Sequence, residues 1–250
     1  MDEPQPLDLL AIGSHPDDVE ISCGGTLALA AHQGFRAGIL DLTRGELATN
    51  GDPQTRARES DEAARLLGVV MRRNAALPDG GLRATDPDQE RAVVALLREL
   101  KPAVILTHFP QDRHPDHVEA SRLCDRAWYL AGLRQFRAGT GPFRPEARYH
   151  YASRVGFHPS LVVDITEVWD LKRAAILAHA SQVLRAGAGT TPTQLNEPEF
   201  QARLEARARH FGTMIGVRLG EPFYSPEPLG FRQLAPWLHA ARPHPSAFTG

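Results

Sequence analysis

Cysteine is scarce in this chain, with only Cys23 and Cys124 among 250 residues. Neither belongs to a CxxC pair, which excludes a zinc site built on thiolates, and we expect two small buried side chains on helices. Long apolar runs are also missing, since no stretch approaches the roughly 20 residues that span a bilayer. Residues 1–6 carry acidic side chains where a secretion signal carries basic ones. We therefore expect a cytoplasmic protein that does not bind membranes.

The chain also lacks a strong excess of charge of either sign. Its net charge is −2 and its pI is about 6.6, which argues against nucleic acid or an anionic membrane as the main partner. Hydrophobic residues make up 42% and charged residues 23%, as is ordinary for a globular protein. The length favours one large domain, which we place at residues 1–235, followed by a surface tail rich in proline and histidine at residues 236–250.

Strand-like and helix-like segments alternate through the first half of the chain. The strands are expected at 7–13, 37–42, 69–75 and 103–107, and the helices at 24–33, 54–67, 89–100 and 117–133. The second half is less regular, with strands expected at 149–152 and 161–165, helices at 167–183 and 199–215, and a loop at 186–193. This order predicts an α/β fold with a Rossmann-like, mostly parallel sheet flanked by helices.

Two segments rich in histidine and aspartate come shortly after predicted strands. They are residues 14–18 (SHPDD), after the first strand, and residues 113–117 (RHPDH), after the fourth. Open α/β sheets build their active sites at the carboxyl ends of the strands. Proline suits the first turn of a helix, so we expect both segments at strand-to-helix junctions. The two segments are therefore predicted to meet at one edge of the sheet.

These segments contain the groups that a hydrolytic metal site needs. Three nitrogen and oxygen ligands leave one position on the ion for water, and a free carboxylate then acts as general base. A further donor must face the oxyanion that develops on the attacked carbonyl. The residues alone do not choose between Asp17 and Asp18 as ligand, or between His114 and His117. A single His-Pro-Asp segment would indicate only a helix cap, but two such segments favour a site.

The two motifs and several shorter segments match one known family. The shorter matches are Glu20, 23–26 (CGGT), 41–46 (DLTRGE), 77–80 (LPDG), 159–165 (PSLVVDI), 181–182 (SQ), 215–216 (IG) and 220–223 (GEPF). Together they resemble the LmbE/PIG-L family of zinc-dependent N-acetylglucosamine deacetylases. The resemblance covers roughly residues 7–234. It is strongest to the bacillithiol-pathway branch, which removes acetate from N-acetylglucosaminyl malate.

The resemblance also implies a metal-ligand set. Carried over to this sequence, it makes His15, Asp18 and His117 the ligands of one Zn²⁺ per subunit, at the C-terminal ends of the strands. Two imidazoles and a carboxylate suit zinc, although such a site also accepts iron, cobalt or manganese.

Catalytic roles follow from the same resemblance. Asp17 would be the general base, and His114 would stabilise the oxyanion and protonate the departing amine. Asp116 would hydrogen-bond His114, favouring its charged form and fixing its orientation. His108 and Asp112 lie between the fourth strand and this motif. They are either partners of the metal ligands or ordinary loop residues, and the sequence leaves both open.

Substrate contacts are implied for Glu46, Arg56 and Asp79, which would bind the glucosamine or its aglycone. For Arg56 an alternative is equally favoured, in which it forms ion pairs with acidic neighbours on a solvated helix face.

We therefore expect a homo-oligomeric, metal-dependent deacetylase acting on a small amino-sugar conjugate. One alternative keeps the chemistry and changes the substrate, giving a deacetylase or amidase for another N-acetylglucosamine or thiol conjugate. Another is a nucleotide-binding α/β module, but its G-x-G-x-x-G turn is missing after the first strand.

Overall fold

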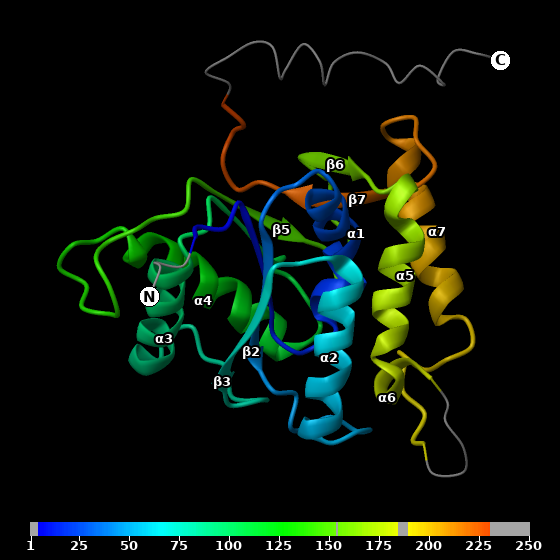
Figure 1. The fold of residues 1–250 in the computed structure, drawn as a ribbon, viewed down its shortest axis with the longest axis horizontal. Coiled ribbons are helices and arrows are strands. Elements are labelled where there is room, and N and C mark those ends of the chain that lie inside the picture. Colours follow the sequence, from blue (N-terminus) through cyan, green and yellow to red (C-terminus); the bar gives the residue numbers. More distant parts are fainter. Residues whose placement is uncertain (1–4, 154, 185–189, 231–250) are drawn as a thin grey trace.

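A seven-stranded sheet forms the centre of the molecule (Figure 1). The computed structural model describes residues 5–153, 155–184 and 190–230. The predicted tail at 236–250, the predicted domain boundary at 235 and half of the predicted loop at 186–193 lie outside these residues. No described helix is long and apolar enough to cross a membrane.

The strands follow the order β3-β2-β1-β4-β5-β7-β6 across the sheet. Their bounds are Leu9–Gly13 (β1), Ala37–Thr43 (β2), Met71–Leu77 (β3), Val104–His108 (β4), Ala147–Tyr151 (β5), Leu161–Asp164 (β6) and Gly220–Tyr224 (β7). Strands β1 to β5 are parallel, whereas β7 runs antiparallel to both of its neighbours. The predicted α/β fold with a mostly parallel sheet is confirmed.

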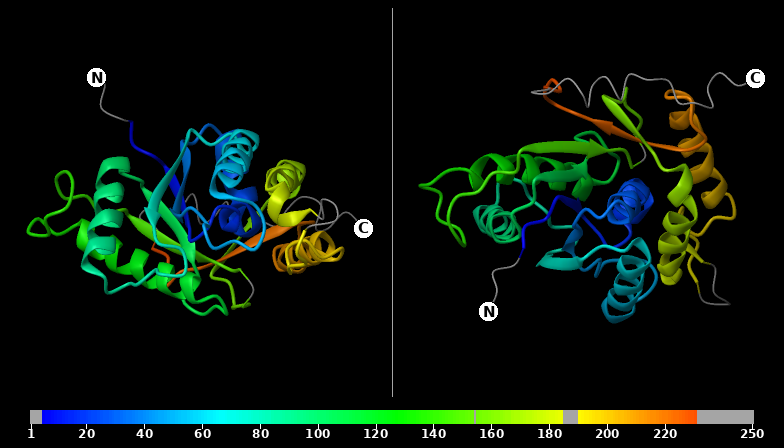
Figure 2. Two further views of the ribbon diagram at one scale, coloured as in Figure 1. Left: turned by 90° about the horizontal axis from the view of Figure 1, so that it is seen from below. Right: turned by 45° about the horizontal axis from the view of Figure 1, so that its top comes forward.

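Helices cover both faces of this sheet. They are Asp18–His32 (α1), Pro53–Leu67 (α2), Pro87–Leu100 (α3), Pro115–Ala131 (α4), Trp169–Ala178 (α5), Ala180–Val183 (α6) and Phe200–Thr213 (α7), with a 3₁₀ turn at Thr166–Val168 (η1). Figure 1 shows α3 and α4 on one side and α1, α2 and α5 on the other. Helix α7 lies beyond α5, against β7 (Figure 2).

Side-chain alternation along the strands divides the core into two layers. On β1, Leu10 and Ile12 join the apolar cluster under α3 and α4, whereas Ala11 joins the cluster under α1 and α2. Each strand of a sheet buried on both faces contributes to both layers in this way. Cys23 and Cys124 are free and fully buried within these layers, as the sequence predicts.

Three helices begin with a capping side chain followed by proline. Asp52 accepts a hydrogen bond from the Thr55 amide at the start of α2, and Asp86 accepts from two amides of α3. His114 caps α4 in the same way, through the amide of Asp116. Proline fits the next position because its missing N–H has no partner there in any case. The strand-to-helix junction predicted at residues 113–117 is therefore present.

Several element boundaries differ from those predicted. Strand β7 was not predicted, because Pro222 removes a ladder donor and the short segment shows no apolar alternation. Helix α1 begins at Asp18 rather than at residue 24, and its backbone departs from helical geometry at Cys23. The single helix predicted at 167–183 is divided at His179, whose buried ring bonds Glu20 at 2.9 Å.

Candidate metal centre

Strands β1 and β4 lie side by side and bring the two histidine–aspartate segments together. From β1 the chain builds the sheet outward through β2 and β3 on one side, and then crosses over to place β4 on the other side of β1. This change of direction creates the crevice at the carboxyl ends where open α/β sheets bind ligands. Residues 14–18 follow β1, and residues 113–117 follow β4 after a short loop.

The three residues predicted as metal ligands are neighbours in the structure. The Oδ2 atom of Asp18 lies 3.3 Å from Nδ1 of His15, and its Oδ1 atom lies 3.2 Å from Nε2 of His117. About a tenth of each side chain is exposed. One carboxylate between two imidazole nitrogens is a donor set that suits a divalent transition metal.

The second nitrogen of each of these imidazoles faces another carboxylate. Nε2 of His15 lies 3.0 Å from Asp79, and Nδ1 of His117 lies 3.3 Å from Asp112. Histidines that bind metals show this arrangement, because the outer carboxylate fixes the tautomer and orients the ring. The residues therefore fit a metal ion.

Further donors surround this cluster. Three groups each have ligand atoms within 4.8 Å of one another: His15–His114–His117, Asp18–His108–His117 and His15–Asp79–Asp116. The His117 ring is stacked between His108 and His114, with centroid distances of 4.1 and 4.7 Å. The described residues thus contain a cluster able to hold a metal ion.

Charge interactions keep the central carboxylate ionised. Burial raises the pKa of Asp18, but the nearby His117 and His108 outweigh burial and hold that pKa well below its usual range. Burial lowers the pKa of His117, yet the carboxylates of Asp18 and Asp112 raise it to about 9. A negative oxygen is therefore available between the two rings.

Asp17 is buried and held in an unusual backbone conformation. Its φ of 118° lies in a region that favours glycine, and such strain costs about 1–3 kcal/mol. Burial raises the pKa of Asp17 to about 6, while Arg56, whose Nη2 atom lies 3.7 Å from Oδ2, opposes this shift. The predicted general base is thus a second carboxylate, directly before Asp18 in the chain.

Arg56 is buried rather than placed on a solvated helix face. Its Nη1 donates to the carbonyl of Gly45 at 2.9 Å and its Nη2 to that of Pro16 at 2.5 Å. The alternative of ion pairs along a solvated helix is therefore wrong. The guanidinium ties the loop after β2 to the loop that carries Asp17.

The partner predicted for Asp116 differs from the observed one. Its carboxylate accepts the Gly80 amide at 2.8 Å and lies 3.4 Å from Nε2 of His15. Only its backbone N–H reaches Nδ1 of His114, at 3.2 Å. Burial, together with the nearby His117 and His15, lowers the pKa of His114. The predicted hydrogen bond from the Asp116 carboxylate to His114 is therefore corrected, because another loop engages this carboxylate. Its charge still raises the pKa of His114, but burial and the two neighbouring histidines outweigh it.

Glu46 and Asp79 lie on neighbouring loops at the rim of the cluster. Glu46 is exposed and accepts the Asp79 amide at 2.9 Å. Asp79 bonds His15 through one oxygen and the Leu47 amide through the other. Burial raises the pKa of Asp79, but these bonds lower it to about 2. Both oxygens of this predicted substrate-binding residue are thus engaged within the protein.

His108 and Asp112, which the sequence left open, both contact the cluster. Nε2 of His108 accepts the Ser14 amide at 3.0 Å, and burial lowers the pKa of this ring to about 4. Asp112 faces His117 and also accepts the His114 amide at 2.9 Å. Their position at the end of β4 and in the loop that follows it, at the same sheet edge, was the one signal in the sequence.

Comparisons with known proteins agree with this geometry. Residues 10–128 match the PIG-L family, described as GlcNAc-PI de-N-acetylase. A diacetylchitobiose deacetylase of Thermococcus kodakarensis is 29% identical, over 85% of this chain and 80% of the relative. A 1D-myo-inositol 2-acetamido-2-deoxy-alpha-D-glucopyranoside deacetylase of Kineococcus radiotolerans is 30% identical, over 72% of this chain and 70% of the relative. The chain belongs to the LmbE/PIG-L family.

Solved structures extend the LmbE/PIG-L likeness to the whole fold. The conserved protein TT1542 of Thermus thermophilus is 42% identical, with a TM-score of 0.82 over 90% of this chain and 97% of that one. A 4-carboxy-2-hydroxymuconate hydratase of Pseudomonas putida is 23% identical, with a TM-score of 0.73 over 90% and 98%. At that identity the second likeness shows the fold alone, so the reaction must be argued from the site.

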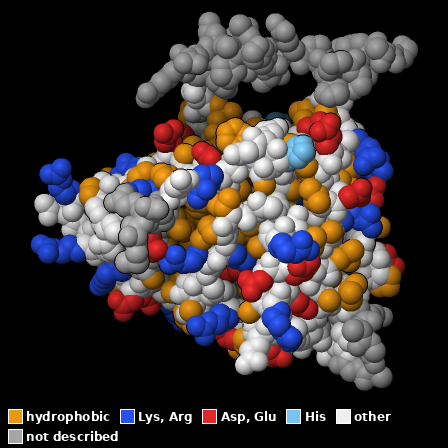
Figure 3. All heavy atoms as spheres, in the orientation of Figure 1, with side chains coloured by type: hydrophobic (Ala, Val, Ile, Leu, Met, Phe, Trp, Pro, Cys, Tyr) orange, Lys and Arg blue, Asp and Glu red, His pale blue; other side chains and the backbone are white. Residues whose placement is uncertain are grey.

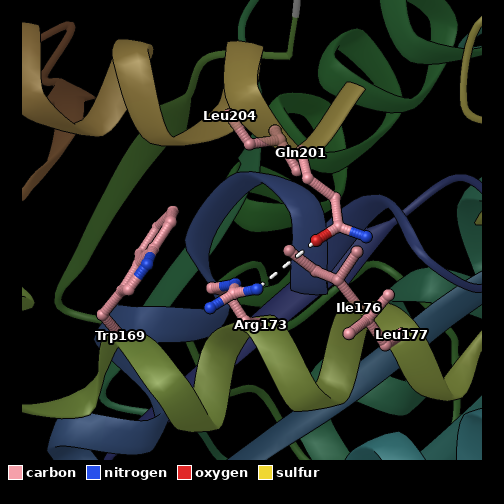
Figure 4. A pocket seen from close by; sticks show the side chains of 6 residues that line it. All are labelled: Trp169, Arg173, Ile176, Leu177, Gln201 and Leu204. Atoms are coloured by element: carbon pink, nitrogen blue, oxygen red, sulfur yellow. Dashed lines mark hydrogen bonds between the residues drawn. The ribbon is translucent and has the colours of Figure 1, made fainter. Parts of the chain in front are cut away.

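Other features of this LmbE/PIG-L chain lie outside the cluster. A small hollow between α5 and α7 is shown in Figure 4, and its lining residues are Trp169, Arg173, Ile176, Leu177, Gln201 and Leu204. None of them belongs to the histidine–aspartate cluster. On the face drawn in Figure 3, Lys and Arg side chains are interspersed with Asp and Glu. Neither feature adds a chemical group to the site.

Proposed function

We propose that this chain is a metal-dependent N-deacetylase that hydrolyses the acetamide of an N-acetylglucosamine conjugate to a free amine and acetate. One observation supports this most strongly: the Asp18 carboxylate lies between His15 and His117, with the buried carboxylate of Asp17 directly before it. A ligand carboxylate and a separate base are what amide hydrolysis at a metal requires.

Zinc is the ion we propose for this site. His15, Asp18 and His117 would hold it, and when bound it would polarise the substrate carbonyl and lower the pKa of water. Asp17 accepts the proton of the attacking water. Its raised pKa suits that role, because a general base works best when its pKa approaches the working pH.

His114 supplies a donor on the other side of the reacting carbonyl. Since its Nδ1 accepts the Asp116 amide, the proton of the neutral ring resides on Nε2. This N–H stabilises the oxyanion, while the proton that Asp17 took from the attacking water passes to the departing amine, so that the ring stays neutral throughout. Asp116 acts on His114 through its backbone amide, and its carboxylate faces His15.

The rim residues have different parts in substrate binding. Glu46 is exposed and can accept bonds from sugar hydroxyls. Arg56 supports Asp17 from beneath the loop, so its contribution to the substrate site is indirect. Asp79 lies between the rim and His15.

The first substrate we propose is N-acetylglucosaminyl malate, which would place the protein in bacillithiol-type thiol biosynthesis in the cytoplasm, as a homo-oligomer. The named activities of the two sequence relatives concern diacetylchitobiose and an inositol glycoside of N-acetylglucosamine. Those two compounds are therefore the main alternatives, and all three substrates carry the same acetamide.

Acetate release from a panel of these compounds tests the proposal. Zinc-loaded protein is incubated with N-acetylglucosaminyl malate, free N-acetylglucosamine, diacetylchitobiose and the inositol glycoside, and the Asp17→Asn variant is the control. We expect release from the malyl conjugate at the highest kcat/KM, and at least a roughly hundredfold lower rate in the variant because the base is lost. Equal rates on the malyl conjugate and free N-acetylglucosamine would refute the malate assignment. No release from any compound would refute deacetylation.

A further inference from the structure

Asp79 joins two rim loops to the metal cluster. Its Oδ1 atom lies 3.0 Å from Nε2 of His15, and its Oδ2 atom accepts the Leu47 amide at 2.8 Å. Its own N–H donates to Oε1 of Glu46 at 2.9 Å. The loop after β2 and the loop after β3 are thus tied to each other, and the tie ends on a predicted metal ligand.

His15 is held from both sides of its ring. Its Nδ1 faces Asp18, whereas its Nε2 faces Asp79 and, at 3.4 Å, Asp116. Only 7% of the Asp79 side chain is exposed, so water competes little for this contact. An Nε2–H directed at carboxylates leaves the lone pair of Nδ1 directed toward Asp18. That is the tautomer and the ring orientation that metal binding at Asp18 requires.

A second cation site is the other interpretation of these three donors, since His15, Asp79 and Asp116 lie within 4.8 Å of one another. Two backbone hydrogen bonds argue against a second cation site. The Leu47 amide points at Oδ2 of Asp79, and the Gly80 amide points at Oδ2 of Asp116. An N–H directed at these oxygens satisfies them and opposes a cation beside them. The arrangement therefore suits two carboxylates that orient an imidazole.

We propose that Asp79 is a positioning residue for His15, and that through Asp79 the rim loop carrying Glu46 and Leu47 is coupled to metal affinity. This inference rests on the metal-dependent function proposed above. Coupling of this kind is reciprocal, so a ligand that orders the rim also strengthens metal binding. Asp79 would then act on the substrate indirectly, through the metal ligand.

The test is the zinc dissociation constant, measured on the full chain by competition with a chromophoric chelator. Loss of a carboxylate that orients a metal-binding histidine typically weakens affinity by about 10–100-fold, and we expect this for Asp79→Ala. Asp79→Asn retains an oxygen that can accept the His15 N–H but loses the charge, so we expect a smaller but measurable loss of about three- to tenfold. Glu46→Gln keeps an oxygen that can accept the Asp79 N–H, so the tie between the loops persists and the zinc dissociation constant should stay within about twofold of the wild type. Asp86→Ala, which removes the cap of α3, controls for lost stability.

Each outcome has one meaning. If wild-type protein fails to bind zinc, the proposed function is wrong. If wild type binds zinc and both Asp79 variants bind it equally well, the positioning role is wrong, and a rise in KM alone would make Asp79 a direct substrate contact. Two zinc ions per chain, one of them lost in Asp79→Ala, would establish a second cation site instead. If Asp79→Ala does not fold, Asp79→Asn decides, because it preserves the side-chain volume.

Discussion

Replacing Arg56 with alanine should destabilise the protein and disturb its general base together. The guanidinium bonds the carbonyls of Gly45 and Pro16 and lies 3.7 Å from the Asp17 carboxylate, with 4% of the residue exposed. An unpartnered buried polar group costs about 1–3 kcal/mol, and removing one member of a buried charge pair about 3–5 kcal/mol. Because the truncation also lets the loop relax, we expect a total loss of about 3–5 kcal/mol, a large part of the usual stability of about 5–15 kcal/mol.

The stability lost in Arg56→Ala should depend on pH. The pKa of Asp17 is raised from 3.8 to about 6, so the folded protein favours the protonated carboxyl group. The stability of the fold therefore falls as pH rises between these two values. Arg56 lowers this pKa, so its removal raises the pKa further. At pH 8 the variant carries an uncompensated buried charge, whereas at pH 5 most of that charge is neutralised. The destabilisation should therefore be larger at pH 8 than at pH 5.

Urea unfolding of metal-free protein at both pH values measures the effect, and the acid limb of kcat/KM provides a second reading. We expect that limb to move to higher pH, because the base ionises later. Arg58→Ala is the matched control, since Arg58 lies on the same helix, is exposed and donates a hydrogen bond to Oγ1 of Thr55. We expect less than about 0.5 kcal/mol for the control. Equal losses in the two variants would show that the buried contacts of the Arg56 guanidinium do not stabilise the fold.

Three further experiments test separate parts of the structure. A Cβ atom at Gly45, where φ is +66°, would lie 1.8 Å from Nη1 of Arg56, so Gly45→Ala should displace the Arg56 side chain. In urea unfolding, the stability losses of Gly45→Ala and Arg56→Ala should therefore combine less than additively in the double variant, and full additivity would contradict this contact. His117→Ala should purify without zinc whereas His114→Ala should retain it, and metal analysis showing zinc in the former would overturn the ligand set. Burial lowers the pKa of His150, so the stability that this neutral ring contributes is fully present above pH 6.5 and is lost as pH falls through its folded-state pKa. The destabilisation by His150→Gln in urea unfolding should therefore shrink from pH 7.5 to pH 5, by at most about 1.4 kcal/mol per pH unit. The same destabilisation at both pH values would contradict this expectation.

Much of the fold could be predicted from the sequence, because the apolar strands of the first half alternate with helices whose ends carry strong signals. Strand β7 could not, since Gly220, Glu221 and Pro222 lack strand-like character. Glu221 is buried there because it accepts two amides of α1 and pairs with Lys172 at 2.5 Å, contacts between distant parts of the chain. No local pattern predicts a strand that such pairing stabilises.

For the site, the sequence predicts which residues meet but not how their side chains are directed. Residues that follow β1 and β4 meet at one edge because parallel strands end together, so the meeting of His15, Asp18 and His117 follows from topology. The direction of each side chain does not. Asp116 turns toward the Gly80 amide, 36 positions away, and Asp79 reaches His15 across 64 positions. Such partners depend on loop conformations that only the folded chain defines.

We propose that a metal held by His15, Asp18 and His117 enables this protein to remove acetate from an N-acetylglucosamine conjugate. This proposal is tested most directly by acetate release from N-acetylglucosaminyl malate, measured on metal-stripped protein before and after zinc is added back. We expect no release from the stripped protein and full recovery at one zinc per chain. Undiminished release after stripping would contradict the claim, as would stoichiometric zinc binding without release from any acetylated amino sugar.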